Sequence, residues 1–328
     1  MIPTDWRAPR YSPAEIRDQS GFQGDWLVSA VVLNWNAARH TCDCLESLSR
    51  QTHAGDRLEV IVVDNGSKED TTCIQEALQD YQREKGWKQS RWIRLDRNHG
   101  IPAGYNIGLE HVSPQSDGLL RLDNDVILDP RFVECAVTAM NRWPSLAVVG
   151  GAQWGEGHRV AGLPSTIRWR ELEFQHFAPG GEEGQPVDCD SIPGCALLVR
   201  RKAIRGMKVL FDPRLWVLHD ETDLMIRLKA AGWRVGYLSA AQCVHQKGVS
   251  TGKVPDFFQY VSARNMILLA KRYAPFPDRL WSYRAAIRSL LQAVLSQNRS
   301  AARGFADGLM GNPWRPRLTQ PLPQQPED

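Results

Sequence analysis

The chain has 328 residues, 42% of them hydrophobic, and a net charge of +3, so it can bury the core of one large α/β domain or of two smaller domains. No apolar run approaches the roughly 20 residues that span a bilayer, and residues 1–20 lack the apolar core of a signal peptide, so we expect a cytoplasmic protein. Seven cysteines, with a single close pair at Cys42 and Cys44, favour reduced thiols over a disulfide framework or a zinc site.

Strand-like and helix-like segments alternate through the first half of the chain. Five apolar segments rich in β-branched residues are predicted strands: 26–36, 58–67, 91–95, 118–122 and 145–151. Four segments between or after them predict helices: about 41–50, 69–85, a glycine-bearing loop and helix within 96–112, and 130–142. This alternation predicts an α/β fold with a doubly wound, mainly parallel sheet flanked by helices.

The second half of the chain has a less regular pattern. Residues 152–190 show no clear period, whereas residues 196–201 predict a short strand. Residues 219–233 predict a helix that begins with acidic residues and ends at Gly232, and residues 235–248 predict a strand and a loop. We therefore divide the chain into three parts by sequence: a polar leader at 1–25, a main domain at 26–255 and a basic helical extension at 256–328.

Polar side chains end three of the predicted strands. Asn34, Asp64 and Asp123 each stand at a carboxyl end, where ligands bind in sheets of this kind. Asp123 and Asp125 are two residues apart, so in an extended segment both carboxylates point the same way and can hold a divalent cation. An ordinary polar turn is the alternative, since an Asp-x-Asp triplet also occurs at 188–190.

Six motifs follow one another in a characteristic order: VVLNWN, VIVVDNGS, RNHGIPAGYNIGL, LDNDV, FDPRLWVLHDETDLMIRLKAAGWRV and CVHQKG. In this order the chain resembles the inverting GT-A glycosyltransferases of the GT2 family, in particular rhamnosyltransferase-like members. The resemblance covers roughly residues 27–275. It implies a GT-A catalytic domain with a nucleotide-binding half at about 26–125, an acceptor half at about 126–255 and a C-terminal helical extension.

The resemblance also implies a reaction and its partners. The expected activity is metal-dependent, inverting transfer of a sugar, with rhamnose as one candidate, from a nucleoside-diphosphate sugar to the hydroxyl group of a glycan or lipid-linked acceptor. Such transfer would serve cell-wall or polysaccharide biosynthesis at the inner face of the membrane. The alternative is a non-catalytic protein of the same fold that binds nucleotide-sugars or acts as a scaffold at a membrane surface. Acidic residues around the core disfavour nucleic acid as a partner.

Eight residues would bind the nucleotide-sugar by this resemblance: Asn34, Trp35, Asp64, Asn98, Gly100, Asn106, Asp123 and Asn124. A carboxylate such as Asp64 accepts hydrogen bonds from base or ribose, although it could equally cap the helix that follows. Trp35 would offer a ring near the base, and simple core packing is its alternative role.

The metal ligands and the base are also implied by the resemblance. Asp123, Asp125 and His245 would hold Mg²⁺ or Mn²⁺ on the donor diphosphate, with Asp125 as the favoured direct ligand. Glu221 aligns with the usual general base, but this chain reads Asp220-Glu221 where family members often read Glu-Asp. Acids at this position could instead only stabilise the helix dipole.

The extension carries a concentration of positive charge. Residues 264–317 hold ten Lys and Arg against two acidic residues. One helix is expected over residues 279–305, with basic and polar residues on one face (Arg284, Arg288, Gln292 and Arg299) and apolar residues on another (Tyr283, Ile287, Leu290, Leu291 and Val294). Residues 280–317 could therefore lie on an anionic membrane, or the apolar face could pack on this domain or on a second subunit.

Overall fold

The computed structural model describes residues 26–155, 160–180, 184–246 and 255–311, so the leader predicted at 1–25 and the last part of the extension lie outside the described residues. The chain forms two compact units. The first, here called the sheet unit, comprises Met1–Thr166, His176–Pro213 and Glu221–Gln246. The second, here called the helical unit, comprises Ile167–Gln175, Arg214–Asp220 and Lys247–Asp328.

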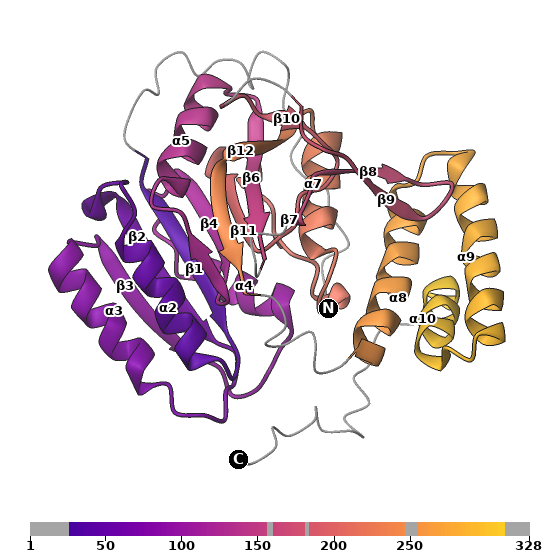
Figure 1. The fold of residues 1–328 in the computed structure, drawn as a ribbon, viewed down its shortest axis with the longest axis horizontal. Helices are drawn as coiled ribbons and strands as arrows, with labels where there is room; N and C mark the ends of the chain where they lie inside the picture. The colour runs from indigo at the N-terminus through magenta and orange to yellow at the C-terminus, as the bar shows by residue number, and fades with distance from the viewer. Residues whose placement is uncertain (1–25, 156–159, 181–183, 247–254, 312–328) are drawn as a thin grey trace. The chain divides into compact units, whose positions relative to one another are not determined.

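The sheet unit is built on a ten-stranded sheet (Figure 1). Its main path runs in the order β10 (Val187–Asp188), β12 (Arg234–His245), β6 (Leu146–Trp154), β11 (Ala196–Arg200), β4 (Gly118–Asp123), β1 (Val28–Asn34), β2 (Leu58–Asp64) and β3 (Gln89–Arg94). Two short strands extend it: β5 (Val126–Leu128) on β12 and β7 (Val160–Gly162) on β6. Strands β4, β1, β2 and β3 are parallel, and β11 runs antiparallel to both of its neighbours. The predicted mainly parallel sheet is confirmed.

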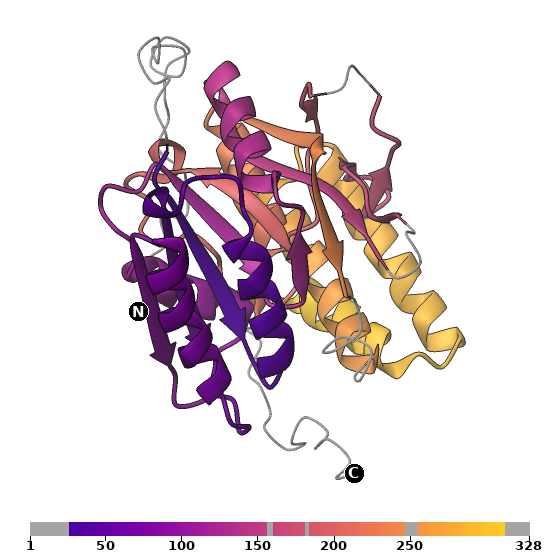
Figure 2. The ribbon, with the colours of Figure 1, turned by 60° about the vertical axis from the view of Figure 1, so that its left-hand side comes forward.

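Helices cover both faces of this sheet. They are α2 (Ala38–Ser49), α3 (Thr72–Lys85), α4 (Ile101–Glu110), α5 (Phe132–Arg142), α6 (Arg201–Ile204) and α7 (Asp220–Ala230), with a 3₁₀ turn at Gly55–Arg57. Figure 2 shows α2 and α3 side by side over the same strands. The side chains of β1 alternate between two hydrophobic clusters: Val28 and Val32 pack under α2 and α3, and Val31 packs under α4. This two-sided burial is why β1 is mostly apolar along its whole length.

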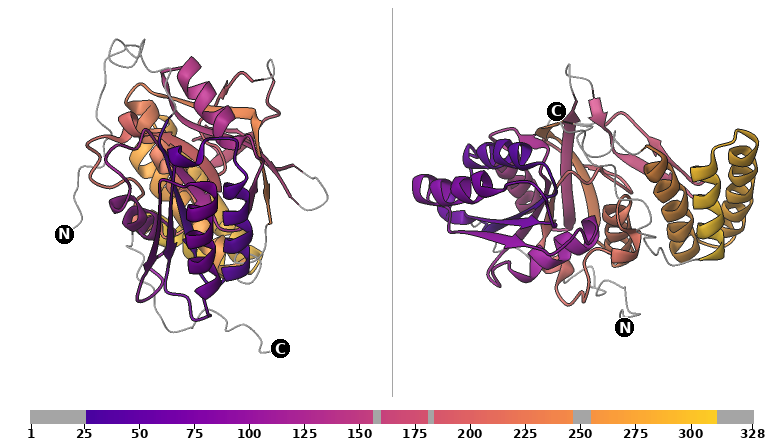
Figure 3. Two further views of the ribbon diagram at one scale, coloured as in Figure 1. Left: turned by 90° about the vertical axis from the view of Figure 1, so that its left-hand side faces the viewer. Right: turned by 90° about the horizontal axis from the view of Figure 1, so that it is seen from below.

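The helical unit contains α8 (Pro255–Tyr273), α9 (Asp278–Leu295) and α10 (Arg299–Met310), drawn side by side in Figure 3. A 3₁₀ turn at Pro213–Leu215 includes residues of both units. A hairpin of β8 (Ser165–Arg168) and β9 (Glu173–His176) includes residues of both units. The single long helix expected from the sequence is wrong, because α9 ends at Leu295 and Arg299 begins a new helix. Asn298 caps that helix by accepting a hydrogen bond from the backbone nitrogen of Ala301, which explains the break.

Asn265 fixes the loop that precedes α7. This buried residue of α8 donates through Nδ2 to the carbonyl groups of Leu215, Val217 and Leu218, at 2.9, 2.9 and 3.0 Å. The loop needs such support because Trp216, Leu218 and His219 all have positive φ values. Among the described residues, no helix is both long enough and apolar enough to cross a bilayer.

Glycines allow α10 to approach α8 closely. A side-chain carbon added at Gly304 would lie 2.3 Å from the carbonyl oxygen of Tyr260, a backbone atom that cannot turn away. We predict that Gly304→Val lowers the free energy of unfolding of the chain by about 3 kcal/mol, measured by urea denaturation followed by circular dichroism. Gly180→Val is the matched control, since nothing lies within 4 Å of a side-chain carbon there. Equal stability of the two variants would contradict the close packing.

Candidate active site

The ends of three parallel strands meet at one edge of the sheet. Asn34 at the end of β1 is in register with Asp64 at the end of β2, and Leu33 is in register with Asp123 at the end of β4. Each of the three polar residues ends a strand whose other positions are buried and mostly apolar. The register places these side chains together without any help from the loops.

A buried hydrogen-bond network connects this edge to α2. Asn34 donates through Nδ2 to Asp64 Oδ1 and to Ser67 Oγ, both at 3.1 Å. Asn34 Oδ1 in turn accepts from Thr41 Oγ1 at 2.8 Å and from Asn124 Nδ2 at 3.3 Å. Both polar atoms of the Asn34 amide are thus engaged inside the protein, so this residue organises the edge of the sheet.

Asp64 has two carboxylate oxygens in different environments. Oδ1 accepts from Asn34 and from both the backbone nitrogen and the hydroxyl group of Ser67. Oδ2 makes no hydrogen bond within the described residues and lies 3.5 Å from Nε of Arg94, whose side chain is half exposed. The carboxylate therefore fixes the turn after β2 with one oxygen, while the other oxygen is buried beside the Arg94 guanidinium.

The loop before α4 is held by a residue that the sequence analysis did not select. Buried Asn65 donates through Nδ2 to Asn98 Oδ1 at 3.1 Å and to the Gly100 carbonyl at 3.2 Å, and it accepts from the His99 backbone nitrogen at 2.9 Å. Gly100 has a φ of 84°, which favours glycine at this position. Asn65 belongs to the DNGS turn, so a second polar residue directly after a strand-end aspartate was the available signal.

Two other predicted nucleotide-binding residues have different surroundings. Asn106 uses both polar atoms on the backbone of Phe211, donating to its carbonyl at 2.7 Å and accepting from its nitrogen at 3.0 Å. The structure therefore does not bring the Asn106 amide together with Asn34 and Asp64. Trp35 is half-buried in the segment that joins β1 to α2.

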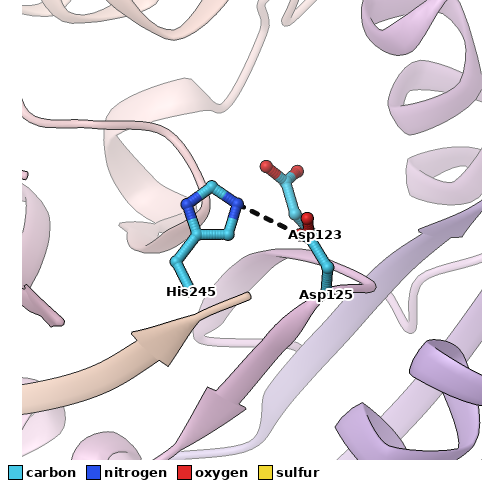
Figure 4. Close-up of side chains that lie close together, drawn as sticks. All are labelled: Asp123, Asp125 and His245. Atoms are coloured by element: carbon cyan, nitrogen blue, oxygen red, sulfur yellow. Dashed lines mark ion pairs between the residues drawn. The ribbon is translucent and has the colours of Figure 1, made fainter. Parts of the chain in front are cut away.

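Asp123, Asp125 and His245 form a compact group of possible metal ligands (Figure 4). One ligand atom from each lies within 4.8 Å of the others, and His245 Nε2 is 3.1 Å from Asp125 Oδ1. The pairing of β12 with β5 brings His245 opposite Val126, next to Asp125 in the chain. Two carboxylates and one imidazole, all half-buried, fit a divalent cation such as Mg²⁺ or Mn²⁺.

The charge balance at Asp123 suits such a cation. Burial raises the pKa of Asp123 above its ordinary value, Arg121 opposes this rise, and the negative charge of Asp125 adds to it. Tyr105 donates its hydroxyl hydrogen to Asp123 Oδ1 at 2.7 Å, and burial raises the pKa of Tyr105 well above its usual range, which keeps it a donor. A bound cation would offset the repulsion between the two carboxylates.

Glu221 lies in the first turn of α7 and faces Arg121. Its Oε2 atom is 3.6 Å from Nη1 of Arg121, and its side chain keeps 15% of its surface exposed. A side-chain carbon at Gly194 would lie 2.9 Å from Cγ of Glu221, so a larger residue there would force the Glu221 side chain to shift. Asp220, by contrast, is 1% exposed. Of the two acids, Glu221 is the one that a ligand can reach.

Arg121 joins the two acidic parts of the site, and the sequence analysis did not select it. Its guanidinium lies 4.6 Å from the ring centre of Tyr105 and 5.1 Å from that of Phe211. Arg121 therefore contacts Glu221 on one side and the tyrosine that binds Asp123 on the other. The signal was a charged residue in the middle of the buried strand LLRLD.

The model of the family described as "Glycosyl transferase family 2" matches residues 29–206 of this chain. A curated relative from Mycobacterium tuberculosis, N-acetylglucosaminyl-diphospho-decaprenol L-rhamnosyltransferase, is 26% identical over 316 residues, which is 84% of this chain and 96% of the relative. The O-antigen biosynthesis protein RfbC of Myxococcus xanthus is 26% identical over 65% of this chain, but the match spans only 16% of that protein.

Two solved structures are similar to this chain in fold. The mannosyltransferase PcManGT from Pyrobaculum calidifontis, in complex with GDP-Man and Mn²⁺, has a TM-score of 0.54 and 16% identity, covering 90% of this chain and 82% of that chain. TarS 1-349 of S. aureus, in complex with UDP-GlcNAc, has a TM-score of 0.53 and 14% identity, covering 88% of this chain and 93% of that chain. At this identity the likeness concerns the fold alone.

We predict that Asp125→Ala abolishes the binding of Mn²⁺, because it removes one of the three possible ligands while leaving the fold intact. Titration of Mn²⁺ followed by electron paramagnetic resonance measures the binding directly. Asp188→Ala is the control, since Asp188 belongs to the other Asp-x-Asp triplet and forms an exposed ion pair with Arg234. If both variants bind Mn²⁺ as tightly as the unmodified chain, the metal assignment is wrong.

Metal binding should also depend on pH. The raised pKa of Asp123 means that this carboxyl keeps its proton to a higher pH than a free aspartate does, so protons compete with the cation over that range. Affinity for Mn²⁺ is therefore expected to fall as the pH falls through the raised value. Tyr105→Phe removes a hydrogen bond that lowers this pKa, so it should move the midpoint to higher pH. A midpoint that the variant leaves in place would contradict this account.

Proposed function

Since the chain belongs to glycosyl transferase family 2 and is a glycosyltransferase with the GT-A fold, we propose that it is a metal-dependent, inverting enzyme. In this proposal a sugar passes from a nucleoside-diphosphate donor to the hydroxyl group of a glycan or lipid-linked acceptor. The observation that carries the proposal is the grouping of Asp123, Asp125 and His245 at the carboxyl end of a mainly parallel sheet. A bound Mg²⁺ or Mn²⁺ supplies positive charge that stabilises the departing diphosphate.

The donor nucleotide is assigned to the edge formed by β1 and β2. Asp64 Oδ2 is an acceptor that a base N–H or a ribose O–H can use once the half-exposed Arg94 side chain moves aside. Trp35 lies directly after Asn34 and offers an aromatic surface, and the loop fixed by Asn65 brings Asn98 and Gly100 to the same edge. In this assignment Asn34 and Asn124 position the site from within the network and do not contact the donor.

Glu221 is assigned as the general base. The acceptor oxygen forms a bond to the anomeric carbon while the bond from that carbon to the diphosphate oxygen breaks, and the hydroxyl proton passes to the Glu221 carboxylate. Arg121 restricts this side chain by its ion pair and is itself held between two aromatic rings. One displacement by one oxygen inverts the configuration of the anomeric carbon.

The sugar and the acceptor are proposed from the mycobacterial relative. Its name describes an L-rhamnosyltransferase of N-acetylglucosaminyl-diphospho-decaprenol, and the match covers nearly the whole of that protein. Rhamnose as the transferred sugar and a lipid-linked N-acetylglucosamine as the acceptor are therefore the first pair to test. Nucleoside diphosphates and their sugars can be ranked by the rise in melting temperature that each causes with Mn²⁺, since a ligand of the folded state stabilises it.

We predict that Glu221→Gln lowers the turnover number by roughly 10² to 10⁴ while leaving the dissociation constant of the donor unchanged. The amide keeps the size of the side chain but cannot take the proton. Transfer to the lipid-linked acceptor measures turnover, and calorimetry measures donor binding. Glu110→Gln, an exposed acid at the end of α4, is the matched control.

Three results would change the assignment. A comparable loss of turnover in Asp220→Asn, with normal turnover in Glu221→Gln, would show that Asp220 is the general base and Glu221 is not. Full activity in both variants would show that the general base does not lie on α7. Donor binding without any product from the unmodified chain would favour the non-catalytic alternative.

A further inference from the structure

Helix α9 exposes its large apolar side chains and buries its small ones. The buried residues of the helix are Ser282, Ala285, Ala286 and Ala293. Six large apolar residues have about half or more of their surface exposed: Leu280, Trp281, Ile287, Leu291, Val294 and Leu295. A surface helix of a globular protein normally shows the reverse arrangement, so this face needs a partner.

The exposed residues form one continuous stripe. Leu280, Ile287, Leu291 and Val294 follow one another at intervals of seven, four and three residues, which places them on one side of an α-helix. Arg284 and Arg288 are exposed and border the stripe on the side of Trp281. At about 100° per residue, all eight side chains fall within an arc of roughly 140°. We call this surface the α9 stripe.

The charge of the α9 stripe is positive. Arg284 lies 5.0 Å from the ring centre of Trp281, so an arginine and an aromatic ring share the border of the apolar surface. Asp278 is the acidic residue of this helix, and it accepts a hydrogen bond from Arg170 at 2.6 Å. No acid therefore lies among the exposed residues of the stripe itself.

We propose that the α9 stripe binds an anionic lipid surface, with the helix lying in the plane of the interface. Aliphatic side chains would enter the acyl region, Trp281 would lie at the level of the headgroups, and Arg284 and Arg288 would pair with lipid phosphates. Pairing of two such stripes in a dimer would instead bring arginines together without acidic partners. The charge of the stripe thus favours a membrane over a second copy of the chain. The inference is independent of which sugar or acceptor the enzyme uses.

Flotation of the full-length chain with lipid vesicles tests the proposal. The chain should float with vesicles that contain phosphatidylglycerol at low salt, and about tenfold less with vesicles of phosphatidylcholine alone, because the basic residues are attracted by anionic headgroups. Added salt should weaken the charged part of the binding.

Two kinds of variant assign the binding to the α9 stripe. Leu291→Gln should reduce flotation about tenfold. Met310→Gln, an exposed apolar residue of α10, should leave it unchanged. The double variant Arg284→Gln and Arg288→Gln should remove the preference for anionic vesicles, whereas Arg279→Gln with Arg299→Gln, which removes the same charge elsewhere, should not.

Two outcomes would overturn the proposal. The first is flotation of the stripe variants to the same extent as the unmodified chain, which would place the lipid contact on another segment. The second is failure of the unmodified chain to float with anionic vesicles at low salt. If light scattering then shows a dimer that Leu291→Gln converts to a monomer, the stripe is a contact between two copies of the chain. Transfer to a water-soluble acceptor analogue should be unchanged in all stripe variants, so a failed membrane test leaves the proposed function standing.

Discussion

In the proposed mechanism, the contact between Arg121 and Glu221 is the interaction on which the chemistry of the site depends. Arg121 stands in the middle of β4, and its side chain is only 6% exposed. Its guanidinium is 3.6 Å from the Glu221 carboxylate. The same guanidinium lies over the ring of Tyr105, which donates to Asp123. A buried positive charge thus stands between the proposed base and the proposed metal ligands. Removal of one partner from such a buried pair leaves the other charge uncompensated. The arginine and the acids are therefore expected to depend on one another energetically.

The strand pattern accounts for the part of the site that the sequence could predict. Continuous apolar runs indicate strands buried on both faces, and the residues that end them must lie at one edge when the strands are parallel. Asn34, Asp64 and Asp123 are therefore placed by register alone. His245 comes to Asp125 through pairing between β12 and β5, far apart in the chain, and only the family resemblance indicated that approach.

The remaining features depend on tertiary contacts that leave no local pattern. Asn106 stands in a motif that favours a ligand contact, yet its amide binds the backbone of Phe211, more than a hundred residues away. The C-terminal extension also could not be predicted from local pattern alone. The sequence analysis placed Ile287 and Arg284 on separate faces of one helix. The structure exposes both residues, because the buried face of α9 consists mainly of alanines. Periodicity indicates which residues share a face but not which face is covered.

The configuration of the transferred sugar tests the central claim most directly. Proton NMR of the product, made from a donor of known anomeric configuration with Mn²⁺ present, distinguishes inversion from retention. The proposed mechanism predicts the inverted product, because it assigns a single carboxylate, Glu221, as the base and a single displacement needs one base. A product with retained configuration would contradict the assignment of Glu221 and the one-step mechanism with it.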